Sequence, residues 1–261
     1  MPFVILYFYI QAAEFMSQST LNLSNYISTE IAGESALILY LTMAEYEGGN
    51  TSELIAALAK KLAAHLSSVI TEVVPSYQSM LISFDLFKVD HLSLSRRIHA
   101  LAAEVTLFDV DSAKEVTLPV YYHSSVGADL SRIAQQAKIS IEDVIKIHQR
   151  PTYTVQAIGF APGFSYLGDV DPKIITPRLN TPRTKVPKGA VAIANNQTAI
   201  YPQVSPGGWN IIGLCPTTLF DPNTEQPSLL SVGDKVKFLA IDKQQFIELG
   251  GKLDEYMVED N

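Results

Sequence analysis

The chain has 261 residues, 47% of them hydrophobic and 18% charged, and its formal net charge is −8 at pH 7. This length allows one large domain or two modest ones, and the acidic balance argues against a nucleic-acid partner, which needs clustered Lys and Arg. The single cysteine, Cys215, excludes internal disulfides and multi-cysteine zinc sites. We therefore expect a reducing compartment and predict the cytoplasm.

Residues 1–15 begin with an apolar run from Phe3 to Ile10. This run is shorter than the roughly 20 residues that cross a bilayer, and it lacks the basic segment and cleavage site of a secretory signal. We interpret it as a disposable leader or an over-extended gene start, with Met16 as the more natural beginning. Membrane tethering is the lesser alternative, and no membrane partner is predicted.

The first half of the chain alternates strand-like and helix-like stretches. Strands are predicted over 36–42, 69–74 (stopped by Pro75), 79–87 and 105–110. Helices are predicted over 92–104 and from about residue 51, where leucines recur every four positions at Leu54, Leu58, Leu62 and Leu66. The order β-α-β-β-α-β predicts a ferredoxin-like α+β domain over residues 16–115.

The second domain, residues 116–245, is predicted to be mainly β, with a tail over 246–261. A strand near residue 118 is followed by two amphipathic helices, 128–137 and 141–148, the second capped by Ser140. Short β-prone stretches at 152–158, 190–194, 199–201 and 236–241 then lie between Pro and Gly residues. That pattern is typical of a β-barrel or sandwich.

Residues 151–220 hold nine of the 14 prolines, half of the 14 glycines and the only tryptophan, Trp209. The same segment contains five Lys and Arg but only two Asp, so it carries a charge of 5 − 2 = +3 in an acidic protein. A rigid, cationic loop region indicates an anionic ligand or partner. Four motifs follow one another: GFAPGFSYLG from Gly159, TPRLNTPRTKVPKGAVAIA from Thr176, NQTAIYP from Asn196 and SPGGWNIIG from Ser205.

These motifs closely resemble the signature of the KipI family, also called the B-type subunit of 5-oxoprolinase and the allophanate hydrolase first subunit. The resemblance runs from about residue 27 to 241, with two departures: Ala190 stands where members often have Ser, and Asn195 where they often have Gly. The resemblance implies a small α+β domain followed by a cyclophilin-like barrel. It also implies a carboxyltransferase-type complex with a larger homologous subunit (the KipA-like, C-type subunit of 5-oxoprolinase) and a LamB/YcsF-like, A-type subunit.

That complex resembles an ATP-driven hydrolase that opens 5-oxo-L-proline to L-glutamate. The chain has no GxxxxGK[ST] phosphate loop, so we expect ATP to act at the level of the complex, and we expect this protein to be inactive alone. Two alternatives stay open: a binding protein that inhibits a sensor histidine kinase, as one Bacillus relative does, and, less favoured, a freestanding prolyl isomerase. Fold alone does not carry that last function.

Arg178, Arg183 and His148 are the catalytic candidates. A guanidinium grips a carboxylate or phosphate through two parallel hydrogen bonds, and a histidine works as acid or base near neutral pH. The alternatives are that the arginines tie loops together or face the partner subunit, and that the histidine completes a helix end. Substrate-binding or interface candidates are Gly159, Phe160, Pro162, Gly163, Phe164, Tyr166, Gln197, Thr198, Tyr201, Pro206, Gly207, Gly208 and Trp209. No metal site is predicted, because His65, His91 and His99 are isolated.

Overall fold

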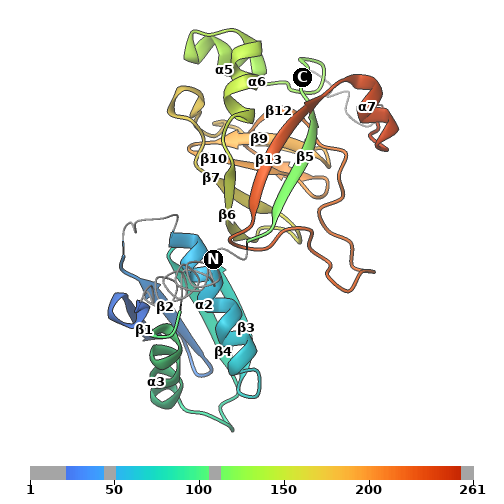
Figure 1. The fold of residues 1–261 in the computed structure, drawn as a ribbon. Helices are drawn as coiled ribbons and strands as arrows, with labels where there is room; N and C mark the ends of the chain where they lie inside the picture. Colours follow the sequence, from blue (N-terminus) through green and yellow to red (C-terminus); the bar gives the residue numbers. More distant parts are fainter. Residues whose placement is uncertain (1–21, 44–50, 106–112, 254–261) are drawn as a thin grey trace, which may run out of the picture. The chain divides into compact units, whose positions relative to one another are not determined.

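The computed structural model describes residues 22–43, 51–105 and 113–253. The chain divides into two compact units, residues 1–113 and 114–261, which are described separately (Figure 1). The predicted leader, residues 1–15, lies outside the described residues. In the part that the structure describes, no helix is long and apolar enough to cross a membrane.

The first unit is an antiparallel sheet with two helices. Its strands lie in the order β1-β2-β4-β3, and each neighbouring pair is antiparallel. The elements follow the chain as η1 Leu23–Tyr26, β1 Ile27–Ile31, β2 Ala36–Leu41, α2 Thr51–His65, β3 Ile70–Ser76, β4 Ser79–Phe84 and α3 His91–Ala102.

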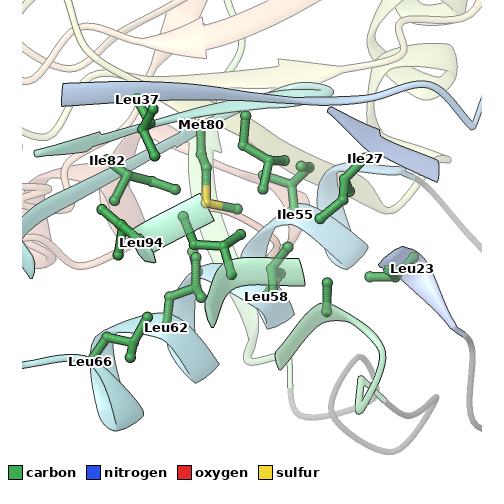
Figure 2. Packing of buried hydrophobic residues seen from close by; sticks show 14 of the residues in the cluster. Leu23, Ile27, Leu37, Ile55, Leu58, Leu62, Leu66, Met80, Ile82 and Leu94 are labelled. Atoms are coloured by element: carbon green, nitrogen blue, oxygen red, sulfur yellow. The ribbon is translucent and has the colours of Figure 1, made fainter. Parts of the chain in front are cut away.

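Leucines on one face of α2 build the core of this unit. Leu54, Leu58 and Leu62, together with Leu66 directly after the helix, form the predicted four-residue series and are all buried. Figure 2 shows the side chains of Leu58 and Leu62 in one cluster with Met80 and Ile82 of β4. The four-residue spacing therefore places a continuous apolar stripe of α2 in the core.

The ferredoxin-like arrangement predicted for this unit is not confirmed. An edge strand that the prediction omitted, β1, pairs with β2. Only Ile27 is buried in β1, so the alternation that identifies strands is missing there. The predicted last strand falls almost wholly on residues 106–112, outside the described residues. The βαββαβ order therefore stays a prediction.

The second unit is a closed barrel of seven strands, so the mainly β expectation is confirmed. The strands close in the order β6-β13-β5-β12-β9-β10-β7 and back to β6, and β13 runs parallel to β5. They are β5 Glu115–Tyr121, β6 Tyr153–Ile158, β7 Ser165–Gly168, β9 Ala190–Ala194, β10 Gln197–Ile200, β12 Asn210–Leu214 and β13 Lys235–Ile241. The specific likeness to cyclophilin stays a prediction.

Short elements complete this unit. They are α5 Leu130–Ala137, α6 Ile141–Gln149, η2 Pro172–Ile174, α7 Lys243–Glu248 and the two-stranded sheet of β8 Arg183–Val186 with β11 Ser205–Gly207. A capping box between Asp242 and Gln245 starts α7, and its Phe246 is buried in the barrel cluster. This helix crosses residue 246, the position at which the C-terminal tail is predicted to begin.

Candidate functional site: an arginine over a tryptophan

Three of the four motifs meet in a cluster of aromatic rings in the barrel unit, which we call the Trp209 cluster: Phe160, Phe164, Tyr166, Tyr201 and Trp209. Phe164 is its centre, with ring centroids 5.3 Å from Phe160, 4.9 Å from Tyr166, 5.2 Å from Tyr201 and 5.7 Å from Trp209. All four contacts are edge-on, the arrangement that aromatic quadrupoles favour.

Exposure varies across the Trp209 cluster. Phe164, Tyr201 and Trp209 are buried, Tyr166 is half-buried, and Phe160 is 64% exposed. Phe160 also has a positive φ of 71°, a conformation that costs a non-glycine residue free energy and is concentrated at functional sites. The loop that follows β6 thus exposes the ring of Phe160 to solvent, while the ring of Phe164 beneath it is buried.

Glycines make room for this packing at two positions. A Cβ atom at Gly207 would collide with the hydroxyl of Tyr201, whereas one at Gly208 would meet Leu179 O at an ordinary 3.5 Å. At Gly163, φ is +80° and a Cβ atom would lie 2.7 Å from Cβ of Phe220. Tyr201 is accordingly enclosed, and burial raises its pKa to about 12.

Arg178, from the remaining motif, lies over the ring of Trp209. Its Cζ atom is 5.7 Å from the centroid of the indole, within the range of a cation–π interaction. The side chain is exposed, and among the described residues no carboxylate or carbonyl accepts a hydrogen bond from its guanidinium. The loop backbone is fixed on both sides: Pro177 O accepts from Asn210 Nδ2 at 3.0 Å, and Leu179 N donates to Gly208 O at 2.7 Å.

Arg183, from the second Thr-Pro-Arg unit, is used differently. Its Nη2 lies 3.0 Å from the carboxylate of Asp129, and its Nη1 donates to Trp209 O at 3.3 Å. Asp129 is buried and also accepts from Ile211 N at 2.7 Å. Arg183 therefore joins β8 to the start of α5 and to β12, which is the loop-tying alternative raised from the sequence.

His148 lies in the core of the barrel. It is fully buried, stacked on Phe238 at 4.6 Å between ring centroids. Thr198 Oγ1 donates to Ala192 O at 3.0 Å and so accepts from His148 Nε2 at 2.9 Å, which leaves Nδ1 to accept from Tyr122 O–H at 2.8 Å. Burial lowers the pKa of His148 to about 3.

Both ring nitrogens of His148 thus have a protein partner, and the side chain has no exposed surface. Its predicted catalytic role stays a prediction that these contacts do not support. Thr198 belongs to the same buried chain of hydrogen bonds rather than to the Trp209 cluster. Its neighbour Gln197 is half-buried on β10, in a pair with Gly168 of β7.

The remaining predicted residues lie around the Trp209 cluster. Gly159 and Pro162 flank Phe160 and Gly163 in the loop between β6 and β7, and Pro206 stands before Gly207 in β11. Sequence reasoning missed Asp129, Arg132 and Asn210. Asn210 directly follows Trp209 in the fourth motif, and this position could have identified it as a site residue. The described residues contain no group of three His, Cys, Asp or Glu suited to a metal ion.

The carboxyltransferase domain family, subdomains C and D, matches residues 27–230 of this chain. A curated relative from Haemophilus influenzae (strain Rd), named as the B-type subunit of 5-oxoprolinase, is 44% identical over 170 residues, which cover 65% of this chain and 79% of the relative. A second relative of the same name, from Bacillus subtilis (strain 168), is 36% identical over 185 residues, which cover 67% of this chain and 77% of that relative.

A solved structure extends the comparison. The protein TTHA0988 superimposes with a TM-score of 0.68 at 35% identity over 79% of this chain. This chain spans only 40% of the TTHA0988 chain. The shared fold is therefore one part of a longer polypeptide in that protein.

Proposed function

The chain belongs to the carboxyltransferase domain family, as a member of its group of B-type 5-oxoprolinase subunits, and from this premise we propose that it is one subunit of an ATP-dependent 5-oxoprolinase. The complex opens the lactam of 5-oxo-L-proline to give L-glutamate. This chain does not do so alone.

The observation that carries the proposal is the 44% identity over 79% of a relative named as the B-type subunit of 5-oxoprolinase. The site agrees with it. The motifs that define the resemblance converge on the Trp209 cluster, where Arg178 offers a cation to solvent. A substrate with a carboxylate and a cosubstrate with phosphates both suit a guanidinium.

Partners are proposed from the extent of the matches. The chain matches subdomains C and D of the carboxyltransferase family and 40% of the longer TTHA0988 chain. We infer that a larger homologous subunit (the KipA-like, C-type subunit of 5-oxoprolinase) supplies the rest of the carboxyltransferase unit. A LamB/YcsF-like, A-type subunit completes the proposed complex in the cytoplasm.

The chemistry is divided between the proposed subunits. Opening a lactam needs an activated amide, and phosphorylation of the amide oxygen by ATP provides one. Because the sequence has no Walker-type phosphate loop, we propose that the nucleotide chemistry depends on the other subunits. The Trp209 cluster and Arg178 then contribute one wall of a shared site, while Arg183 and His148 maintain the fold behind it.

An omission assay tests this proposal. The three proteins of the complex are purified, mixed, and supplied with 5-oxoproline and ATP, and glutamate and phosphate are measured with each protein left out in turn. Release of both products should need all three. If leaving out this chain changes nothing, the proposal is wrong, and binding to the dimerisation domain of a sensor histidine kinase becomes the next assay.

A further inference from the structure

The structure distinguishes the two Thr-Pro-Arg units, which the sequence leaves equivalent. We infer that Arg178 is a preset anion-binding residue, taking a carboxylate or a phosphate, and that Asn210 is the residue that positions it. The inference rests on the proposed function for the identity of the anion, which is either the carboxylate of 5-oxoproline or a phosphate of ATP.

The two arginines differ in what neutralises their charge. Arg183 is held by a buried carboxylate and by a backbone carbonyl, so its charge is already neutralised. Among the described residues, Arg178 lies over the indole of Trp209 and interacts electrostatically with the Tyr201 hydroxyl, but no carboxylate or carbonyl accepts a hydrogen bond from it. A cation–π contact uses the charge of a guanidinium without giving its N–H groups an oxygen acceptor, so these donors are still available to a ligand. Those donors match two oxygens of one carboxylate or phosphate.

The backbone on both sides of Arg178 is held in place. Pro177 has a fixed φ, its carbonyl is held by Asn210, and Leu179 is held by Gly208 O. An exposed arginine normally loses side-chain and loop freedom when it binds a ligand, and this loss weakens binding. Here the loop is ordered beforehand and the indole restricts the side chain, so less freedom is lost on binding.

Asn210 holds the loop of Arg178 from the interior of the barrel unit. It has no exposed surface, and its Nδ2 donates to Pro177 O and to Ile193 O, both at 3.0 Å. Its Oδ1 accepts from Arg132 Nη1 at 2.6 Å, which fixes which end of the amide faces the Pro177 loop. Asn210 thus links β9, α5 and the loop of Arg178 without reaching solvent, and it acts on the site through Arg178.

Trp209 provides a direct reporter, because it is the only tryptophan in the chain and Arg178 lies over its ring. The experiment titrates the full chain, and the three-protein complex, with 5-oxoproline, with ATP and with 2-pyrrolidinone, the same lactam without a carboxylate, while tryptophan fluorescence is followed. A saturable change is expected with 5-oxoproline or with ATP but not with 2-pyrrolidinone. Whichever anion gives it is the ligand.

Variants then assign the change to Arg178. Arg178→Met should raise the dissociation constant for that anion about 30-fold, because one charged hydrogen-bonding partner is lost. Arg178→Lys should restore part of the affinity. The matched control is Arg150→Met, which removes another exposed guanidinium of the same unit, paired with Asp171. It should leave the titration unchanged.

Asn210→Asp keeps the size of the side chain and the acceptor for Arg132 but loses both donors. It should weaken anion binding in the wild-type background and cause no further loss of affinity in the Arg178→Met background. A merely structural effect would weaken binding in both backgrounds. Circular dichroism confirms that each variant is folded. A response to neither anion in the chain or the complex, or an undiminished response in Arg178→Met, overturns the inference. Failure of the omission assay overturns only the proposed function, because the fluorescence does not depend on turnover.

Discussion

Asp129 and Arg183 form an ion pair in which the guanidinium Nη2 lies 3.0 Å from the carboxylate, although 54 residues separate them in the chain. The side chains are only 7% and 22% exposed. Asp129 also accepts a hydrogen bond from Ile211 N. One carboxylate therefore joins the start of α5 to β8 and β12, next to the backbone of Trp209.

We predict that Asp129→Ala lowers the free energy of unfolding by about 3 kcal/mol, because it leaves a largely buried guanidinium without its counter-charge. The matched control is Glu115→Ala, which breaks the exposed pair with Lys237, 3.0 Å long. That change should cost about 0.5 kcal/mol or less. Urea denaturation measures both. Equal losses would show that the Asp129 pair is no more than a surface contact.

The two neighbouring glycines of the SPGGWN motif should differ in their tolerance of alanine. Gly207→Ala drives a methyl group into the hydroxyl of Tyr201, a side chain that is only 2% exposed, and should cost about 2 kcal/mol of stability. Gly208→Ala meets only ordinary contacts and should stay within about 0.5 kcal/mol. Urea denaturation with near-ultraviolet circular dichroism checks this. The reverse order would contradict the described packing.

His148 should make the protein less stable in mild acid. Burial lowers its pKa from the ordinary value of 6.5 to about 3, so between these values the unfolded chain takes up a proton that the folded chain does not. Its contribution is complete above pH 6.5 and is lost as the pH falls toward 3. From pH 7 to pH 5 the loss should be about 2 kcal/mol.

The comparison for this pH effect is His148→Gln, which has no titrating group. It should be less stable than the wild type at pH 7 but should show a pH dependence flatter by that amount. Unfolding free energies at both pH values measure the difference. Identical slopes in the two proteins would mean that His148 does not titrate as its burial implies.

Asn195 has a positive φ of 53° in the hairpin between β9 and β10, a conformation that suits the glycine expected here from the resemblance and that asparagine also tolerates. Asn195→Gly should therefore change stability by about 0.5 kcal/mol or less, since glycine adopts this conformation freely. Asn195→Val should cost about 1–2 kcal/mol, the penalty of a left-handed backbone. Thermal unfolding distinguishes the two. A stable valine variant would contradict the strain.

The helices were the most predictable part of the fold. The four-residue leucine spacing found α2, and the predicted helices 128–137 and 141–148 correspond to α5 and α6. These signals are local, because a helix repeats its buried face within a few residues. Strands were harder: β1 buries only Ile27, and β3 continues through Pro75 to Ser76, where the hairpin ladder still pairs Pro75 with Met80.

The site was predictable in its membership but not in its roles. The motifs led to Phe164, Trp209 and Arg178, which the structure brings together. Which of the two arginines stays open to solvent depends on Asp129, and the fixing of the Arg178 loop depends on Asn210, 33 residues from Pro177. Such pairings join residues that are far apart in the sequence, and no local sequence pattern predicts them.

The most direct test of the central claim is a titration of this chain into fixed amounts of the other two 5-oxoprolinase proteins, with glutamate release from 5-oxoproline and ATP as the readout. We predict a rate that is negligible without this chain, rises with its concentration and reaches a plateau at a fixed mole ratio. A rate that is already full without the chain, or that falls as the chain is added, would contradict its role as a working part of the complex.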